Sequence, residues 1–245
     1  MRKHATTILL VLAAVVLGVW LWVDRDRVTE GERRRRENSV FPAWRRDELS
    51  RIEIQRDGEV LVLERDAKAE SSWRMKSPRD ERADQAAVER LVMALEFATV
   101  VRKVGEGGDL GLDPPRARGS VTMGGLVHRF VLGGASPRPE GSGYLRLDDA
   151  APFVVSRELV DALLSPVDAY RDRTVVPYLS LEVARFQVSR PGGGFTLEHM
   201  DKQAFRVADV GVMASREALD KVWGALGEMR AEAFPDEAEA ERLAR

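Results

Sequence analysis

The chain of 245 residues contains no cysteine. Disulfide bonds, thiolate metal sites, cysteine nucleophiles and a lipid-modified N-terminal cysteine are therefore excluded. Histidine is scarce: His4, His128 and His199 lie in different segments, and none has a second histidine at the spacing of a metal site. The sequence predicts no metal site and no cofactor, and it favours surface or half-buried positions for His128 and His199.

Charge of one sign is also lacking, because 38 basic residues stand against 40 acidic ones and the formal net charge is -2. A nucleic-acid-binding protein needs a strongly basic face, so no nucleic acid partner is expected. The hydrophobic fraction of 44% and the charged fraction of 32% are typical of a globular protein rather than a disordered one.

Motifs of phosphate binding and nucleophilic catalysis are missing as well. No glycine pair is followed by the Lys-Ser or Lys-Thr of a phosphate-binding loop. Ser136 lies between an alanine and a proline, outside any nucleophile elbow. With 40 acidic residues, carboxylate pairs are unavoidable and do not indicate catalysis by themselves. We therefore predict no catalytic residue and no enzyme, and an unrecognised membrane-tethered enzyme is kept as an alternative.

One long apolar run is present, from Ala5 to Val23, and it carries no charge. At about 1.5 Å per residue, it is long enough for a hydrocarbon core of ~30 Å. Trp20 and Trp22 fall at its end, where amphipathic rings favour the headgroup region. A cleaved signal peptide would have a shorter apolar core followed by a small-x-small cleavage site. We therefore predict a transmembrane anchor in residues 1–23, with Ala5 to Val23 in the lipid bilayer.

The basic residues around the anchor do not point in one direction. Two precede it, whereas Arg25, Arg27 and the run from Arg33 to Arg36 follow it, and a plain count would place the C-terminal side in the cytoplasm. Residues 24–40 form a charged juxtamembrane linker with few apolar side chains. We interpret this linker as a solvated stalk. The alternative is a polybasic segment in contact with anionic headgroups.

A first β-β-β-α module is predicted in residues 41–105. Residues 49–54 alternate, Asp57-Gly58 is typical of a tight hairpin, and residues 60–64 return as a second strand. A short third strand at Trp73 precedes a helix that Asp84 caps. The apolar stripe of this helix consists of Val88, Leu91, Val92, Leu95 and Ala98.

The same pattern returns in residues 177–245, where Ser215 caps the helix. Arg51, Glu64 and Arg74 of the first copy match three residues of the second: Arg185, Glu198 and Arg206. We interpret the two copies as a duplicated unit. The prediction is that Ile52, Ile54, Val88, Leu91 and Leu95 are buried like Phe186, Val188, Leu219, Val222 and Leu226.

The segment between the copies, residues 106–176, is predicted to be rich in β-strands and to contain a short helix at residues 157–164. The predicted fold class is therefore α+β, with an N-terminal transmembrane helix and duplicated β-β-β-α modules flanking this segment. Arg171, Asp172 and Arg173 form its most polar cluster. Arginine–aspartate pairs of this kind fix a domain junction or contact a partner, and both interpretations stay open.

This arrangement resembles the domain-of-unknown-function family 4340. The resemblance is carried by the strand pair at 50–64, the Trp73-Arg74 strand, the helix entry at 83–88, the Gly-Leu-Asp-Pro-Pro motif at 111–115 and the segment 170–173. It covers nearly the whole chain after the anchor. Other members are longer, so the second module is expected to be incomplete, and either the protein ends at Arg245 or this chain is a fragment.

Members of the family have an N-terminal membrane helix and an extracytoplasmic region, and they are typically encoded beside an ABC-type transport system related to the gliding-motility one. The resemblance implies a single-pass inner-membrane protein whose C-terminal region lies outside the cytoplasm. It also implies a non-catalytic accessory or scaffold role, with the membrane permease subunits of such a system as partners. The alternative is a binding module for an envelope polymer or a small ligand.

Overall fold

The computed structural model describes residues 38–41, 44–66, 72–105, 108–178, 182–201, 204–235, 239 and 241–242. The predicted anchor from Ala5 to Val23 and the linker up to residue 37 lie outside these ranges. None of the described helices is both long and apolar enough to cross a bilayer. The described fold is α+β, and it divides into a first unit that ends at Tyr170 and a second unit that begins at Arg171.

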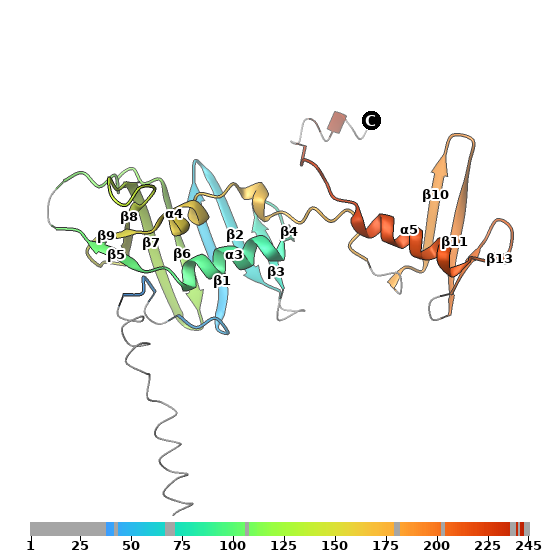
Figure 1. Cartoon of the computed structure of the whole chain (residues 1–245), viewed down its shortest axis with the longest axis horizontal. Coiled ribbons are helices and arrows are strands. Elements are labelled where there is room, and N and C mark those ends of the chain that lie inside the picture. The colour runs from blue at the N-terminus through green and yellow to red at the C-terminus, as the bar shows by residue number, and fades with distance from the viewer. Residues whose placement is uncertain are drawn as a thin grey trace, which may run out of the picture. The chain divides into compact units, whose positions relative to one another are not determined.

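The first unit is built on a nine-stranded sheet whose hydrogen-bonded neighbours are all antiparallel (Figure 1). Its strand order is β4-β3-β2-β1-β6-β7-β8-β9-β5. The strands are β1 (Leu49–Arg56), β2 (Glu59–Arg65), β3 (Trp73–Ser77), β4 (Glu81–Arg82), β5 (Val100–Lys103), β6 (Ala117–Met123), β7 (Leu126–Ala135), β8 (Gly143–Leu147) and β9 (Phe153–Val155).

One face of this sheet packs against the helices α3 (Gln85–Glu96) and α4 (Arg157–Leu163), followed by the 3-10 helix η1 (Val167–Tyr170) (Figure 1). The side chain of Asp84 accepts a hydrogen bond from the Ala87 N–H at 2.8 Å, as predicted for an N-cap. Val88, Leu91 and Leu95 are buried in one cluster with the inward-facing residues of the strands.

The predicted first module and the predicted β-rich segment share this single sheet. β1 pairs with β2 on one side and with β6 on the other, so the predicted boundary at residue 105 does not separate two sheets. β5 was not predicted, because it is short and largely exposed. It pairs with β9 at the far edge of the sheet, away from the strands β1 to β4 that precede it in the chain.

The hairpin between β1 and β2 turns at Asp57 and Gly58, which have φ angles of 48° and 81°. A two-residue turn with positive φ at both positions is the one that Asp-Gly favours. The tight hairpin predicted at Asp57-Gly58 is therefore confirmed.

The second unit carries a four-stranded antiparallel sheet in the order β10-β11-β12-β13 and the helix α5 (Figure 1). Ser215 caps α5 and accepts a hydrogen bond from the Ala218 N–H at 3.2 Å. The elements are β10 (Arg185–Arg190), β11 (Gly193–Asp201), β12 (Ala204–Val207), β13 (Val212–Met213) and α5 (Arg216–Glu228).

The two units repeat the same strand order and the same register. Arg51 lies opposite Glu64 in the first hairpin, and Arg185 lies opposite Glu198 in the second. The third strands also agree, because both glutamates pair with an arginine. Each unit adds a two-residue fourth strand, β4 or β13, which the sequence did not predict. The observed repeat is therefore four strands and a helix.

The predicted burial is confirmed for the first copy only. Ile52, Ile54, Val88, Leu91 and Leu95 are at most 2% exposed. Of the five counterparts in the second copy, only Leu219 is buried, whereas Phe186, Val188, Val222 and Leu226 are partly exposed, so the prediction was wrong for these four. The physical reason is the smaller core, which consists of Leu197, Phe205 and Leu219 with partly buried neighbours.

Candidate functional site

The predicted polar cluster lies at the beginning of the second unit. Arg173 Nη1 donates to the carbonyl oxygens of Ala231 at 3.3 Å and Glu232 at 2.7 Å, and the Ala231 N–H donates to the Arg173 carbonyl at 2.8 Å. The guanidinium carbon of Arg171 lies 3.7 Å from the ring centroid of Phe234. A cation over an aromatic face is attractive, so these contacts hold the chain after α5 against the beginning of the unit.

Asp172 has a local role in the same cluster. Its Oδ1 accepts a hydrogen bond from the Thr174 N–H at 2.8 Å, which is the geometry of an Asx turn. Thr174 then forms an isolated bridge with Arg230. These contacts of the cluster join residues of the second unit to one another, and a role of Arg171, Asp172 and Arg173 in binding a partner stays a prediction.

A shallow pocket of about 310 Å³ lies between α3 and α4 in the first unit. Its lining combines Arg90 and Ala94 of α3 with Glu158 and Asp161 of α4, and Tyr170 lines it as well. The Tyr170 hydroxyl donates to the Ala162 carbonyl at 3.1 Å, and burial raises the pKa of this tyrosine. The charged lining residues are exposed to solvent. The pocket is therefore lined by exposed charged side chains and by one hydroxyl, that of Tyr170, which already donates a hydrogen bond to the Ala162 carbonyl.

The two histidines of the described ranges, His128 and His199, contact neighbouring side chains of their own units. His128 is half-buried, with Nδ1 3.0 Å from Asp148 Oδ2, and its buried Nε2 has no hydrogen-bond partner among the described residues. His199 is half-buried and stacks on Phe205 with 4.8 Å between ring centroids. The surface or half-buried positions predicted for both are therefore confirmed. Within the described ranges, no three histidine or acidic side chains come together as metal ligands.

Ser136 is buried, and its hydroxyl donates to the carbonyl oxygen of Arg138 at 3.0 Å. The Ser136 N–H donates to the Ser142 carbonyl at 2.8 Å. The Ser142 hydroxyl donates in turn to Pro139. Ser136 therefore stabilises the loop between β7 and β8, and His128 bonds to Asp148 instead.

A surface that the sequence did not predict lies on the face of the nine-stranded sheet opposite to α3. Side chains alternate between the two faces of a strand, and the neighbours Phe130, Leu132 and Leu145 are in the core. Arg129 and Val131 of β7 and Arg146 of β8 therefore point to the other face. Arg118 of β6 joins them, because it pairs with Val131. We call Arg118, Arg129 and Arg146 the arginine surface.

The register brings these three arginines close together. Val131 pairs with Arg118 on one side and with Arg146 on the other, and Arg129 is two residues away on the same strand. Adjacent strands are about 4.8 Å apart, so the Cα atoms of Arg118 and Arg146 are separated by roughly 10 Å. Within the described part of the chain, none of the three guanidinium groups has an ion pair or a hydrogen bond. Three arginines without an ion pair among the described residues therefore share a small area, beside Asp148, whose carboxylate interacts electrostatically with Arg129.

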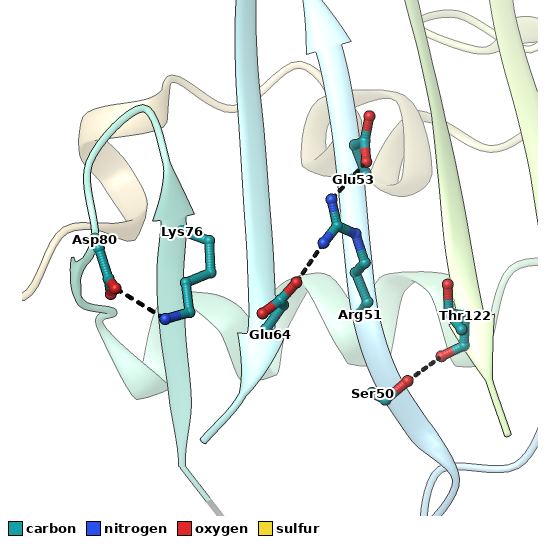
Figure 2. A network of polar contacts seen from close by, with 7 residues as sticks. All are labelled: Ser50, Arg51, Glu53, Glu64, Lys76, Asp80 and Thr122. Atoms are coloured by element: carbon teal, nitrogen blue, oxygen red, sulfur yellow. Dashed lines mark hydrogen bonds and ion pairs between the residues drawn. The ribbon is translucent and has the colours of Figure 1, made fainter. Parts of the chain in front are cut away.

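Basic residues on the other half of the same face are neutralised (Figure 2). Arg51 bonds to Glu64 and, at 3.0 Å, to Glu53. Lys76 bonds to Asp80 at 2.8 Å, and hydrogen bonds from Lys76 and Arg74 lower the pKa of this aspartate. The sheet face thus divides into a neutral half on β1 to β3 and a positively charged part on β6 to β8.

The near-zero net charge of the chain gave no indication of the arginine surface. Each arginine occupies an outward position in a strand whose alternate residues are apolar, and that pattern was visible in the sequence. The pairing of β6, β7 and β8, which brings the three side chains together, was not visible in the sequence. A net charge of -2 therefore does not exclude a local basic surface.

Comparison with known protein families identifies the family of this chain. A family model described as "Domain of unknown function (DUF4340)" matches residues 73–245. The chain belongs to this family. The DUF4340 match begins at the first residue of β3 and includes the whole second unit. No curated protein and no solved structure matches the chain.

Proposed function

We propose that this DUF4340 protein is a non-catalytic, membrane-anchored accessory or scaffold component of an ABC-type transport complex related to the gliding-motility one. In this proposal Ala5 to Val23 anchors it in the inner membrane, and the two units act outside the cytoplasm. The partners are the membrane permease subunits of the transport system. Membership of DUF4340 supports the proposal through the genetic association that the resemblance implies.

The proposal that the protein acts by contact rather than by catalysis is supported by the hydrogen bonds of its buried polar side chains. Among the described residues these are Ser136, Ser142 and Thr196. Both serines donate their hydroxyls to loop carbonyls. Catalytic groups are typically buried, perturbed and free to meet a substrate, whereas these groups stabilise loops.

Co-purification tests the proposal directly. The full chain, tagged at its C-terminus and extracted in mild detergent, should enrich permease subunits of one ABC-type system, as identified by mass spectrometry. An unrelated single-pass protein with the same tag and expression level is the matched control. Equal recovery of permease subunits with both proteins would remove the support for a scaffold role.

The arginine surface favours a second candidate, a binding module for an anionic envelope polymer. Arginine presents a planar fork of donors that fits phosphate and carboxylate groups, and three such side chains gather around Val131 without a salt bridge among the described residues. A polymer with repeated anionic groups would meet several arginines at once. The two candidates differ in the partner that the full chain retains: a protein complex or a polyanion.

A further inference from the structure

β10 is an edge strand of its sheet. The Ala184 carbonyl accepts a hydrogen bond from the His199 N–H at 2.9 Å, and Phe186 and Val188 follow in register with β11. Hydrogen-bonded and non-hydrogen-bonded pairs alternate in an antiparallel ladder. The even-numbered residues of β10 therefore turn their N–H and C=O groups toward β11, whereas Arg185, Gln187 and Ser189 turn theirs away from it. Within the described ranges, no strand pairs with that second edge.

The first unit shows what occupies the same edge. β1 is the counterpart of β10, and its edge away from β2 is paired with β6 along Arg51↔Thr122, Glu53↔Ser120 and Gln55↔Arg118. The corresponding edge of β10 is formed by Arg185, Gln187 and Ser189. Because strand order and register agree in the two units, the geometry that accepts β6 in the first unit is repeated in the second.

The apolar side chains of β1 and β10 differ in exposure, as the presence of β6 beside β1 alone leads us to expect. Ile52 and Ile54, beside β6, are 0% and 2% exposed. Their counterparts Phe186 and Val188 are partly exposed, although Phe186 contacts Trp223 of α5 at 5.5 Å between ring centroids. An added strand would cover the open side of both residues.

The charges indicate what kind of strand fits. In the first unit Arg51 bonds to Glu53 and Glu64. In the second unit glutamine replaces Glu53, and the counterpart of Glu64, Glu198, bonds to Arg206 at 2.8 Å instead. Arg185 consequently has no ion pair among the described residues. A carboxylate on an incoming strand, at the place that Thr122 occupies opposite Arg51, would lie beside it.

We propose that β10 binds an extended segment of a partner polypeptide, which adds as an antiparallel strand and places an acidic residue opposite Arg185. Strand addition combines main-chain hydrogen bonds for affinity with side-chain contacts for specificity. A second copy of this chain fits less well. Outward-facing residues pair with outward-facing residues in an antiparallel ladder, so two β10 strands centred on Gln187 would set Arg185 opposite Ser189, and β10 supplies no carboxylate.

β6 supplies the template for a probe. A Cβ at Gly119 would collide with the Glu53 carbonyl and with Phe130, so the strand that pairs with β1 uses glycine at this position. The probe is therefore a fluorescent peptide with the sequence of residues 117–123, which keeps Gly119 and carries Thr122→Glu. Binding is measured by fluorescence anisotropy with the full chain in mild detergent.

The full chain should bind this peptide, and Gln187→Pro should weaken binding by about tenfold or more, because proline removes an N–H that points away from β11. The matched control is a peptide with the additional change Ser120→Pro, which lacks the N–H expected to pair with Gln187. It should not bind. Equal binding of the first peptide to the full chain and to the Gln187→Pro variant would overturn the proposal.

A charge exchange tests the position of the carboxylate independently of the proline variant. Arg185→Glu should weaken binding of the Thr122→Glu peptide and strengthen binding of the peptide with Thr122→Lys. An unchanged preference would overturn the proposal. So would a dimer of the full chain that Gln187→Pro converts to a monomer, because the occupant would then be a second copy.

The inference rests on the proposed scaffold role only in that the partner is a polypeptide. Failure to enrich permease subunits would count against the proposed function and leave the peptide result standing. Absence of any peptide binding would count against the edge-strand proposal and leave the co-purification result standing.

Discussion

Arg51 and Arg185 occupy the same position in the same register, yet they have different partners. Arg51 bonds to Glu53 and Glu64, whereas Arg185 faces a glutamate that Arg206 already binds. Two differences separate the copies: Gln187 stands where the first copy has Glu53, and Arg206 bonds to Glu198, whereas its counterpart Arg74 bonds to Asp80. Surface ion pairs contribute little to stability, so such a change costs the fold little and alters what the surface can bind.

Matched leucines in the two helices test the difference in burial. Leu95 of α3 is 0% exposed, and its counterpart Leu226 of α5 is half-buried. Leu95→Ala should cost roughly 2–5 kcal/mol of local stability, and Leu226→Ala about half of that or less because less apolar surface returns to water. Hydrogen exchange, followed by mass spectrometry on peptides of α3 and α5, measures both in the full chain. A larger effect at Leu226 would contradict the described packing.

Asp148 provides a prediction about pH. Burial raises its pKa, but hydrogen bonds from the Arg129 N–H and from His128 oppose burial, and the pKa lies below the ordinary value of 3.8. The ionised carboxylate therefore stabilises the folded state above about pH 4, and this contribution is lost as the pH falls through the lowered pKa. Asp148→Asn should lower the melting temperature at neutral pH, with a difference from the unsubstituted chain that shrinks below pH 4. A difference that grows in acid would contradict the sign.

At the scale of elements, the sequence predicted the features that local chemistry determines. Asp-Gly predicted the β1–β2 turn, and Asp84 and Ser215 marked the two helix starts. The pairing of β1 with β6 could not be predicted from local sequence patterns. It depends on contacts between segments about 70 residues apart, such as that between Ser50 and Thr122. β4, β5 and β13 were missed because each is too short for a periodic pattern.

The arginine surface is a property of three elements together. Replacing Arg118, Arg129 and Arg146 by glutamine should lower the salt concentration at which the full chain elutes from a dextran sulfate column, because each contact with an anion releases counterions. The matched control replaces the paired residues Arg51, Arg74 and Lys76 of the same face by glutamine. It removes equal charge and should shift elution less. Equal shifts would mean that only net charge matters and would remove the support for a polymer-binding site.

At the scale of the whole molecule, the repeat was predictable and the inequality of its copies was not. The matching residues predicted two similar units, and the registers of β1–β2 and β10–β11 agree. Burial depends on what covers each copy of the repeat. Among the described residues, strands β6 to β9 and α4 pack against the first copy, and no further strand pairs with the sheet of the second. A sequence pattern describes an element's own face, whereas exposure is set by its neighbours.

Topology is the first prediction for the whole chain. Residues after Val23 should lie outside the cytoplasm, as the family resemblance implies, although a plain count of lysine and arginine around the anchor favours the opposite orientation. A reporter that is active only in the periplasm, fused after Arg245, should be active. A reporter that works only in the cytoplasm is the matched control. Activity of the cytoplasmic reporter alone would refute the orientation.

The last prediction concerns the need for tethering. A scaffold works beside its partner, and an anchor raises the effective concentration of the two units at the membrane. Replacing residues 1–23 by a cleavable signal should therefore bring the phenotype close to that of a deletion, even though the released protein folds. Ser136→Ala, the matched single change in a buried hydroxyl, should keep function, because that hydroxyl bonds to Arg138 and Arg102 and has a structural role. A released protein with full function, together with loss of function in a folded Ser136→Ala variant, would replace the scaffold proposal with an enzyme, since loss of a catalytic group typically costs about 100-fold or more in rate.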